Sequence, residues 1–244
     1  MKKINIILPI FNQEKYIQKN LNKLIKKLNQ LKIVYKLILI DDKSVDQSLK
    51  IIKKFETESI LVLKNKKNMG KGYSLKKAFS RVEKDCFVII WDSDLPYYNR
   101  INFLIKKALQ NDCKFISINR RLINSKIIQE DFSFYSLFRV FIGYVFNFFS
   151  RIVFSIDCKD TQAGLKGFDY SFIKYFKKTI NDSFLFDLEM FIILKNLNII
   201  NQYVSCKYIV NRNSSIKINI FFLMKMFIDF FKIYKLYKKK YYEF

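Results

Sequence analysis

The 244-residue sequence contains no histidine. This absence excludes His-based catalytic triads, histidine general bases and histidine metal ligands, and with them many hydrolase and zinc mechanisms. Glycine and proline are also scarce, with 5 and 2 residues, so few features mark domain boundaries. The sequence shows no internal repeat and no Gly/Ser linker, and its length fits one large α/β domain with a short extension.

Cysteine is used sparingly, and the residues are widely separated along the chain. No two of them have the spacing of a metal site. Buried free thiols in a reducing compartment are therefore the expected state. The four positions are Cys86, Cys113, Cys158 and Cys206.

The sequence opens without a secretory signal, because its first apolar segment, Ile4–Phe11, is short and contains Pro9. No run reaches the ~20 apolar residues that a membrane span requires. The nearest approach, Phe132–Ile156, is interrupted by Arg139 and Arg151. We therefore expect a soluble or peripheral protein.

Acidic residues are in the minority, since 45 Lys and Arg face 21 Asp and Glu for a formal net charge of +24. Such an excess attracts polyanions, namely nucleic acid, anionic lipid or phosphorylated substrates. The lysines are spread along the chain, which is equally typical of a solvated surface. A nucleic-acid-binding module is one alternative. We do not favour a nucleic-acid partner, because a concentrated basic patch is missing and the acidic clusters described below would have no role.

Apolar runs of strand length alternate with helical spacing over the first half of the chain. The expected strands are Ile4–Ile10, Lys36–Ile40, Ile60–Leu63, Cys86–Trp91 and Lys114–Asn119. The expected helices are Glu14–Leu31 with Asn12 as its N-cap, segments carrying Val45–Phe55 and Leu75–Val82, and Ile101–Leu109. This alternation predicts an α/β fold with a mostly parallel sheet flanked by helices. The second half is less regular, with an aromatic-rich helical region at Phe132–Phe154 and a helix from about Asn219.

Two acidic clusters directly follow predicted strands. Asp41 and Asp42 follow Lys36–Ile40, while Asp92 and Asp94 follow Cys86–Trp91. Ligands of an open α/β sheet bind beyond the carboxyl ends of its strands. Carboxylates at that edge suit a hard cation such as Mg²⁺ or Mn²⁺ together with a phosphorylated substrate. The alternative is a pair of solvated turns in which Asp94, Ser44 or Asp46 caps the next helix.

Three further segments combine glycines or carboxylates with apolar neighbours. Asn68–Gly72 holds two of the five glycines, which permits close approach of backbone to a ligand, and Lys71 can meet a phosphate. It matches neither the phosphate-loop pattern nor the dinucleotide-binding pattern. Asp160–Phe168 contains two more glycines, and Phe186–Glu189 places two carboxylates at the start of an apolar helical run. Each of these segments alone is equally consistent with an ordinary loop or cap.

Taken in order, these segments resemble those of family 2 glycosyltransferases with the GT-A (Rossmann-like) fold, and in particular the dolichyl- and polyprenyl-phosphate sugar transferases. Leu8–Glu14 resembles the family's Pro-x-Tyr-Asn-Glu-Glu, Asp41–Asp46 its Asp-Asp-Gly-Ser-x-Asp, Asn68–Gly72 its Asn-x-Gly-Lys-Gly, Asp92–Leu95 its Asp-Ala-Asp-Leu, Asp160–Lys166 its Asp-Thr-Gln-x-Gly-Phe-Lys, and Phe186–Glu189 its Phe-Asp-x-Glu. The resemblance spans most of residues 4–217. Lys43 replaces the usual glycine, and Pro96-Tyr97-Tyr98 follows the second cluster where many relatives carry Gln or Ser.

For the donor, the resemblance implies a nucleotide diphosphate sugar of the GDP-mannose or UDP-glucose type and a Mg²⁺ or Mn²⁺ ion. Pro9, Phe11, Glu14 and Asp42 would line the nucleoside pocket. Asp92 and Asp94 would bind the metal ion against the diphosphate. Asp187 and Glu189 would orient the sugar. Asp41, Lys71 and Gln162 are further candidate substrate contacts.

For the acceptor, the resemblance implies a polyprenyl or dolichyl phosphate and an inverting transfer. Such a phosphate is already ionised near pH 7, with a second pKa of about 6, so no strong general base is needed. Basic residues would hold it, and each is alternatively a plain surface charge. The candidates are Arg120, Arg139, Arg212 and Lys217. We count Asp94, Asp187, Glu189 and Arg139 as the catalytic candidates.

The C-terminal segment, residues 218–244, is predicted to be an amphipathic basic helix that follows a glycosyltransferase domain at 1–217. Between Ile220 and Leu236 the charges form one stripe, and Lys238–Lys240 follows. This pattern suits the surface of an anionic membrane, which predicts a peripheral enzyme on the cytoplasmic membrane face. A core helix or a homodimer helix is the alternative. Any flipping of product across the bilayer would require a separate membrane protein.

A second reading of the same fold is transfer to a carbohydrate hydroxyl in the synthesis of a cell-surface polysaccharide. That acceptor needs a general base, and Asp187 is the candidate. The sequence alone leaves both acceptors open.

Overall fold

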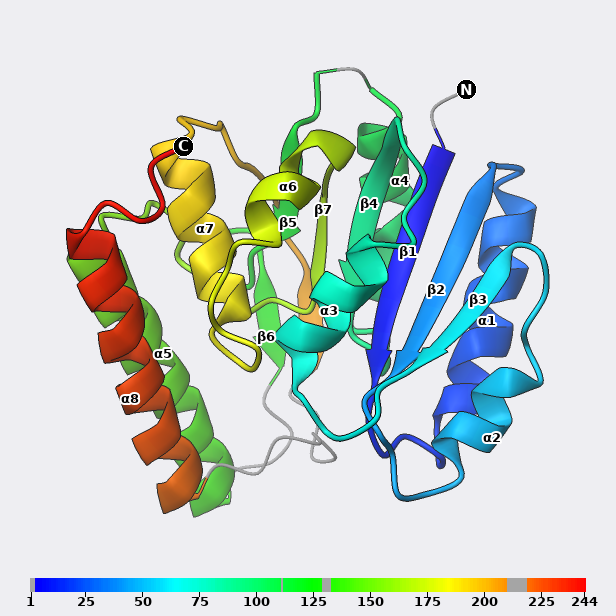
Figure 1. Cartoon of the computed structure of the whole chain (residues 1–244), viewed down its shortest axis with the longest axis horizontal. Coiled ribbons are helices and arrows are strands. Elements are labelled where there is room, and N and C mark those ends of the chain that lie inside the picture. The colour runs from blue at the N-terminus through cyan, green and yellow to red at the C-terminus, as the bar shows by residue number, and fades with distance from the viewer. Residues whose placement is uncertain (1–2, 111, 129–132, 210–218) are drawn as a thin grey trace.

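A computed structural model of the chain describes residues 3–110, 112–128, 133–209 and 219–244 (Figure 1). Its centre is a seven-stranded sheet in the order β3-β2-β1-β4-β7-β5-β8, beside a two-stranded sheet of β6 and β9. The strands are β1 (Lys3–Ile10), β2 (Tyr35–Asp41), β3 (Ile60–Lys64), β4 (Cys86–Trp91), β5 (Phe115–Ile118), β6 (Lys126–Ile128), β7 (Leu165–Asp169), β8 (Gln202–Val204) and β9 (Lys207–Ile209). All neighbouring pairs are parallel except those that involve β7. The predicted α/β architecture with a mostly parallel sheet is confirmed.

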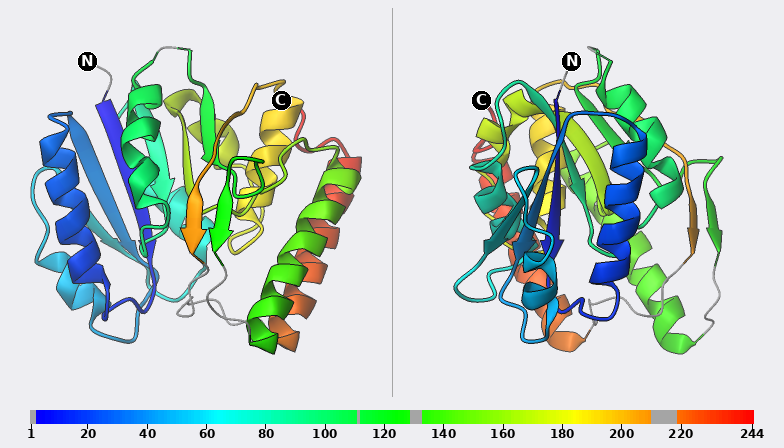
Figure 2. Two further views of the ribbon diagram at one scale, coloured as in Figure 1. Left: turned by 180° about the vertical axis from the view of Figure 1, so that it is seen from behind. Right: turned by 90° about the vertical axis from the view of Figure 1, so that its right-hand side faces the viewer.

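Helices cover both faces of the large sheet (Figures 1 and 2). One face packs against α1 (Ile17–Gln30), α2 (Ser48–Lys53) and α4 (Ile101–Ala108). The other packs against α3 (Lys71–Phe79), α6 (Ile173–Phe176) and α7 (Phe186–Asn196). Short 3₁₀ turns, Tyr98–Arg100 and Tyr170–Phe172, precede α4 and α6. Outside the second layer, α5 (Phe134–Phe154) and α8 (Ile220–Lys238) run side by side in the same direction.

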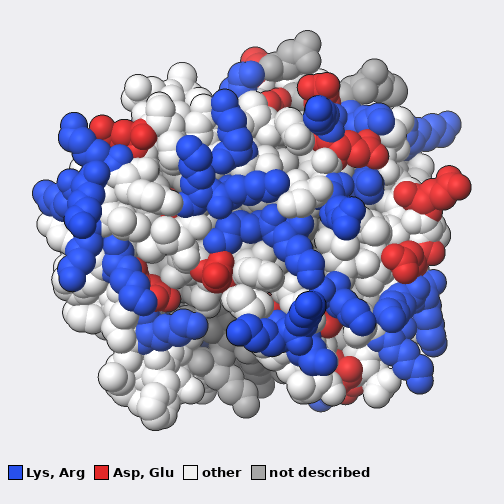
Figure 3. Space-filling model, in the orientation of Figure 1, with Lys and Arg blue, Asp and Glu red and all other residues white. Residues whose placement is uncertain are grey.

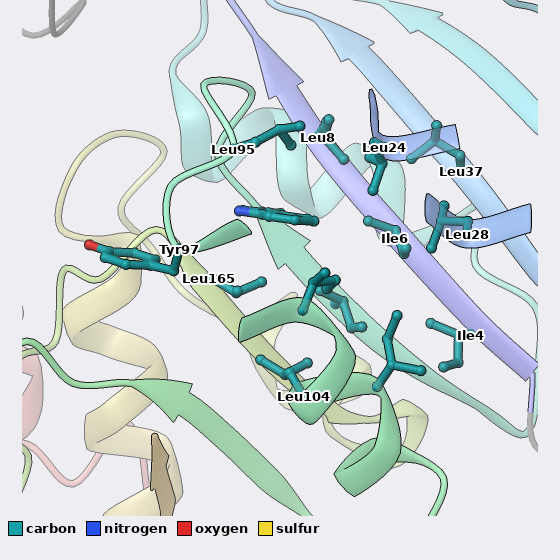
Figure 4. Close-up of a cluster of buried hydrophobic side chains, with 14 of the residues drawn as sticks. Ile4, Ile6, Leu8, Leu24, Leu28, Leu37, Leu95, Tyr97, Leu104 and Leu165 are labelled. Carbon is teal, nitrogen blue, oxygen red and sulfur yellow. The ribbon is translucent and has the colours of Figure 1, made fainter. Parts of the chain in front are cut away.

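Successive side chains of β1 point to opposite faces of the sheet and therefore pack into two different cores. Ile4, Ile6 and Leu8 pack with the α1 layer, as Figure 4 shows, whereas Ile7 packs with the α3 layer. Every residue of β4 is buried, which explains why its sequence is a continuous apolar run. The two cores hold the carboxyl ends of β1, β2 and β4 at one edge of the sheet.

Pro9 lies in β1, a strand with a neighbour on each side. Pairing of β1 with β4 ends at Ile7, whereas pairing with β2 continues through Pro9 to Ile10. The missing N–H of Pro9 therefore interrupts no bond to β4, which is where proline is tolerated in a sheet.

Two local predictions differ from the structure. The first helix begins at Ile17 with Tyr16 at its N-cap, so the prediction of Asn12 as the cap was wrong. Asn12 adopts a positive φ of 52° and its Oδ1 accepts a hydrogen bond from the Val45 N–H instead. In addition, β6, β7, β8 and β9 were not predicted as strands.

All four cysteines are buried free thiols, as predicted. Burial raises the pKa values of Cys86 and Cys158 to about 12, so these thiols are unreactive at neutral pH. The reducing compartment remains a prediction.

Among the described residues, α5 alone is long and apolar enough to cross a membrane, judged by length and composition. Arg139 and Arg151 interrupt this segment, which is why its sequence was not expected to span a membrane. One side of α5 nevertheless packs against the rest of the protein, since Phe146, Asn147, Ser150 and Phe154 are buried. Phe230 of α8 packs against the Phe146 and Phe154 rings.

Candidate functional site

The candidate site lies at the edge of the sheet where β1, β2 and β4 end and where α3 and α7 begin (Figure 1). Asp41 is the last residue of β2, and Asp92 directly follows β4. Lys71 is the first residue of α3, and Asp187 lies in the first turn of α7. Because parallel strands end at one edge, these residues from distant parts of the sequence come together.

The loop after β1 and the loop after β2 are bound to each other by reciprocal hydrogen bonds. Asn12 N–H donates to Ser44 Oγ over 3.0 Å, and Glu14 N–H donates to Asp46 Oδ2 over 3.1 Å. In return, the Gln47 N–H donates to Glu14 Oε2 over 2.9 Å. The hydroxyl and carboxyl side chains of Asp41–Asp46 therefore fix the backbone of the first loop. We call these hydrogen bonds between the two loops the clasp. Glu14, predicted to line the nucleoside pocket, uses one carboxylate oxygen as an acceptor in the clasp.

Asp42 is buried and accepts hydrogen bonds mainly from the glycine loop. It accepts hydrogen bonds from the N–H groups of Met69 and Gly70, and from Asn65 Nδ2, at 2.7–2.8 Å. Asp42 therefore holds this loop, and the nucleoside contact expected from the sequence stays a prediction.

Asp41 is the carboxylate with spare capacity at the end of β2. It is 1% exposed, and its Oδ2 accepts from the Ser44 N–H. Its Oδ1 is buried and has no hydrogen-bond partner within the described part of the chain. A buried carboxylate oxygen without a partner is costly, so Asp41 is suited to accept a hydrogen bond from a ligand.

Lys71, Asp92, Asp187 and Lys166 form one charged network at the floor of the site. Lys71 Nζ lies 2.9 Å from Asp92 Oδ1 and 3.1 Å from Asp187 Oδ2, and Lys166 Nζ lies 2.9 Å from Asp187 Oδ1. Burial alone would oppose the charge of Asp187, but Lys166 and Lys71 hold its pKa below the usual range. Asp187 is therefore ionised at neutral pH and is a weak proton acceptor.

Gly164 is required for the position of Asp92. The Asp92 N–H donates to the Gly164 carbonyl over 2.8 Å, and a Cβ on Gly164 would overlap Asp92 Oδ2. The pairing of β7 with β4, Leu165 opposite Trp91, brings the two residues together.

Asp94 lies two residues beyond Asp92, with one side open to solvent and the other against the protein. Desolvation at the floor of the site and the neighbouring Asp92 carboxylate raise the pKa of Asp94 to about 6. The positive charges of Lys71 and of Arg139 in α5 partly offset this rise. The backbone after Asp94 is unusual, since both Leu95 and Tyr97 adopt positive φ angles of 50° and 61°.

Glu189, predicted to orient the sugar, is fully buried away from this network. Its carboxylate accepts hydrogen bonds from the N–H groups of Ile180 and Asn181 and from the Tyr242 hydroxyl. A carboxylate occupied in this way cannot also bind a sugar. We therefore reassign Glu189 to holding the chain around it.

Arg120 is bound to a buried carboxylate. Its Nε and Nη2 donate to the two oxygens of Asp160, each over 2.7 Å. Although burial opposes the charge of Asp160, Arg120 holds its pKa below the usual range. The pair uses two of the five N–H donors of the guanidinium.

A groove of about 760 Å³ opens beside Arg120, between the segment after β5 and helix α5. Its walls carry the cations Arg120, Arg121, Arg151 and Lys159 and the rings of Tyr144, Phe148 and Phe149. Arg121 stacks over the Tyr144 ring at 4.0 Å and donates to the Gly143 carbonyl. The groove thus combines positive charge with aromatic surface.

The other predicted site residues are placed as follows. Phe11 is 37% exposed in the loop after Pro9. Gln162 is half-buried, and its amide nitrogen lies 3.4 Å from Thr161 Oγ1. Arg212 and Lys217 lie outside the described residues. Lys166 belongs to the Asp160–Lys166 motif but was not predicted as a site residue, because its burial follows from its place in β7, which was not predicted as a strand.

The residues at this site suit a divalent ion. The described residues contain no group of three or more carboxylate or thiol ligands, so a metal ion would need ligands from a bound substrate. Asp92 and Asp94 supply two carboxylates, and their mutual repulsion is of the kind that a cation relieves. Mg²⁺ typically takes one or two carboxylates together with substrate phosphates.

Comparisons with known proteins agree with this geometry. The family model described as glycosyl transferase family 2 matches residues 5–183. A dolichyl-phosphate beta-glucosyltransferase of Dictyostelium discoideum is 29% identical over 211 residues, which cover 80% of this chain and 63% of that protein. An undecaprenyl-phosphate 4-deoxy-4-formamido-L-arabinose transferase of Proteus mirabilis is 30% identical over 98 residues, 39% of this chain and 30% of that protein.

Among solved structures, glucosyl-3-phosphoglycerate synthase from Mycobacterium tuberculosis, in complex with Mn²⁺, UDP and phosphoglyceric acid, superposes with a TM-score of 0.61 at 16% identity. The match covers 87% of this chain and 72% of that chain. This likeness confirms the GT-A fold. The chain spans 63% of the length of the Dictyostelium relative.

Proposed function

The chain belongs to glycosyl transferase family 2, and from this premise we propose that it transfers a hexose from a nucleoside diphosphate sugar to a polyprenyl phosphate, with inversion and with a divalent ion. The observation that carries the proposal is the crowding of Asp92 and Asp94 at the end of β4, beside the Lys71 ammonium. Such a floor suits a diphosphate with its cation. The relatives named above act on dolichyl and undecaprenyl phosphates, which supports the same class of acceptor here.

The nucleoside would lie between the loops after β1 and β2. Pro9 and Phe11 offer an apolar wall. The Oδ1 of Asp41, which has no partner among the described residues, offers an acceptor for an N–H of the base or a hydroxyl of the ribose. The clasp between Glu14 and Gln47 keeps both loops in place without a ligand. This preorganisation lowers the entropy cost of binding the donor.

Asp92 and Asp94 would hold the divalent ion, either Mg²⁺ or Mn²⁺. When bound, the ion supplies Lewis-acid neutralisation of the charge that grows on the diphosphate. Lys71 adds a fixed positive charge at the same place, because Asp92 and Asp187 hold its ammonium in position. Gln162 and Asp187 remain the candidates to contact the sugar.

The transfer itself needs no general base. An ionised oxygen of the acceptor phosphate attacks the anomeric carbon, and the bond from that carbon to the donor diphosphate breaks on the opposite side. The nucleoside diphosphate leaves with the electron pair. Arg139, whose charge partly offsets the raised pKa of Asp94, and Arg120 would hold the acceptor phosphate. Arg212 and Lys217 stay candidates for the same role.

The basic groove and α5 support a lipid acceptor. A polyprenyl phosphate presents a charged head and an apolar chain, and the groove offers cations and aromatic rings side by side. The hydroxyl-acceptor alternative is less well supported, because its candidate base, Asp187, is held ionised by two lysines and has a lowered pKa.

We further propose that α5 and α8 place the enzyme on the cytoplasmic face of a membrane. Both helices expose large apolar side chains, among them Phe141, Phe148, Phe227 and Phe231. Figure 3 shows uncharged surface toward the lower left, where these helices start, and Lys and Arg over much of the rest of that face. An apolar surface bordered by cations suits the headgroup region of an anionic bilayer. In this division, residues 1–217 carry the chemistry, and 218–244 provide the surface contact together with α5.

One assay tests the proposal. The purified protein is given UDP-glucose or GDP-mannose with Mg²⁺ or Mn²⁺, and either a short polyprenyl phosphate or a carbohydrate acceptor. We expect metal-dependent transfer of the sugar to the lipid phosphate. Transfer to the carbohydrate alone would overturn the acceptor assignment in favour of the hydroxyl alternative.

A further inference from the structure

The carboxylate of Glu189 joins two segments that are distant in sequence. It accepts hydrogen bonds from Tyr242 Oη over 2.7 Å, from the Ile180 N–H over 2.8 Å and from the Asn181 N–H over 2.6 Å. Tyr242 lies in the tail after α8 and is fully buried. Hydrogen bonds are stronger where water is excluded, so three donors on one buried carboxyl group hold these segments firmly.

The segment that Glu189 holds, Thr179–Ser183, presses against the start of α3. The Tyr73 N–H donates to the Asp182 carbonyl over 3.0 Å. A Cβ on Gly70 would overlap the Asp182 carbonyl oxygen, and one on Gly72 would come equally close to that of Asn181. Gly70 also has a φ of 96°, which favours glycine. The two backbones therefore approach too closely for a side chain at either glycine position.

Lys76 adds an ion pair and a hydrogen bond to the same contact. Its ammonium lies 2.6 Å from Asp182 Oδ1 and donates to the Thr179 carbonyl over 2.9 Å. The start of α3 and the Thr179–Ser183 segment thus behave as one packed unit. Lys71, between Gly70 and Gly72, is the residue of that unit that reaches the charged floor of the site.

We propose that Tyr242 is a positioning residue for the donor site: through Glu189 and the Thr179–Ser183 segment, it fixes the start of α3 and so holds Lys71 against Asp92 and Asp187. The inference rests on the proposed function only for what Lys71 contacts, namely the diphosphate of the donor. Tyr242 itself touches no reacting group. Its own place is fixed by Asn196, whose side-chain amide donates to the Tyr242 carbonyl over 3.2 Å.

The test compares Tyr242→Phe with Tyr241→Phe. Each variant removes one hydroxyl from the tail, but the Tyr241 hydroxyl donates to the Lys178 carbonyl at the surface and does not reach Glu189. A second variant, Glu189→Gln, keeps the side-chain volume and takes away acceptor capacity. Hydrogen exchange of the Ile180, Asn181 and Tyr73 amides is measured in the full chain, together with binding of UDP and GDP in the presence of Mn²⁺.

For Tyr242→Phe and Glu189→Gln we expect faster exchange at all three amides and nucleotide binding weaker by about three- to tenfold. The KM for the donor rises by the same factor while kcat changes less than about twofold, because the residue positions a binding group. Tyr241→Phe should behave as the wild type. Faster exchange at Ile180 and Asn181, with Tyr73 and nucleotide affinity unchanged, would overturn the proposal.

Failure of the proposed function has a different signature. If the wild-type protein binds neither nucleotide, the proposed donor is wrong, yet exchange at Tyr73 still decides whether Tyr242 controls the start of α3. In that case, unchanged Tyr73 exchange in both variants would be enough to overturn the proposed positioning role of Tyr242.

Discussion

At the scale of single residues, the site depends on two carboxylates that lie close enough to repel each other. Asp94 shares the end of β4 with Asp92, and its pKa is raised to about 6. Lys71 offsets part of the repulsion by pairing with Asp92. The remaining repulsion is a cost that a bound cation would remove, which is why such pairs are found at metal-dependent sites.

Asp94→Asn should therefore change stability in a pH-dependent way when no divalent ion is present. The folded-state pKa of Asp94 lies above the unfolded value, so the wild type loses stability as the pH rises from about 4 to about 6. The Asn variant should be more stable near pH 7 by on the order of 1 kcal/mol, because solvent screens an exposed group. Thermal unfolding at pH 4 and pH 7 measures this difference, and equal stability of both proteins at pH 7 would contradict it.

Gly164→Ala tests the position of Asp92. The new methyl group would displace the Asp92 carboxylate, and a displacement of about 1 Å at a catalytic site typically costs about 100-fold in rate. Because Asp92 is partly exposed and can move, the fold should persist, as circular dichroism would confirm. Turnover near the wild-type level would show that the Asp92 position does not matter.

At the scale of elements, the parallel half of the sheet could be predicted because its strands are continuous apolar runs that end in polar residues. Asp41 and Asp92 were located in this way. The antiparallel strand β7 could not, since Lys166 and Gly167 interrupt its apolar pattern and its partners are distant in sequence. Hence the roles of Gly164 and Lys166 became visible only in the structure.

The sequence was also insufficient to separate ligand contacts from structural contacts among the carboxylates. Asp41 and Asp42 are adjacent, yet Asp42 accepts hydrogen bonds from the glycine loop, while one Asp41 oxygen has no partner in the part of the chain that the structure describes. Glu189 similarly looks like a partner of Asp187 in sequence but bonds to Tyr242. Long-range pairing decides these roles, and no local pattern encodes it.

Helix α8 carries a prediction about membrane binding. Phe227 and Phe231 are exposed and their rings are 4.7 Å apart, so the double change Phe227→Asp and Phe231→Asp alters the outer face alone. Burial of one such ring contributes about 1.5–3 kcal/mol, so binding to liposomes should fall about tenfold or more. Ile200→Asp, at a position elsewhere that is 87% exposed, is the control for introducing a carboxylate at an exposed apolar site. Equal sedimentation of all three proteins would argue for a core or dimer role of α8.

At the scale of the whole molecule, the net charge of +24 predicts an ionic-strength dependence. Lys and Arg border the apolar helices on the face shown in Figure 3. The Debye length shrinks from about 10 Å at 0.1 M salt to about 3 Å at 1 M. Binding to anionic liposomes should weaken strongly over this range, whereas the weaker binding to neutral liposomes should hardly change. Salt-independent binding to anionic liposomes would contradict an electrostatic contribution.

The most direct test of the account is a crystal soaked with Mn²⁺ and UDP. We predict an anomalous peak for manganese between the carboxylates of Asp92 and Asp94 and the diphosphate, with the uracil beside Asp41 and Phe11. Density for the nucleotide at another surface, with both aspartates turned to bulk solvent, would contradict the central claim.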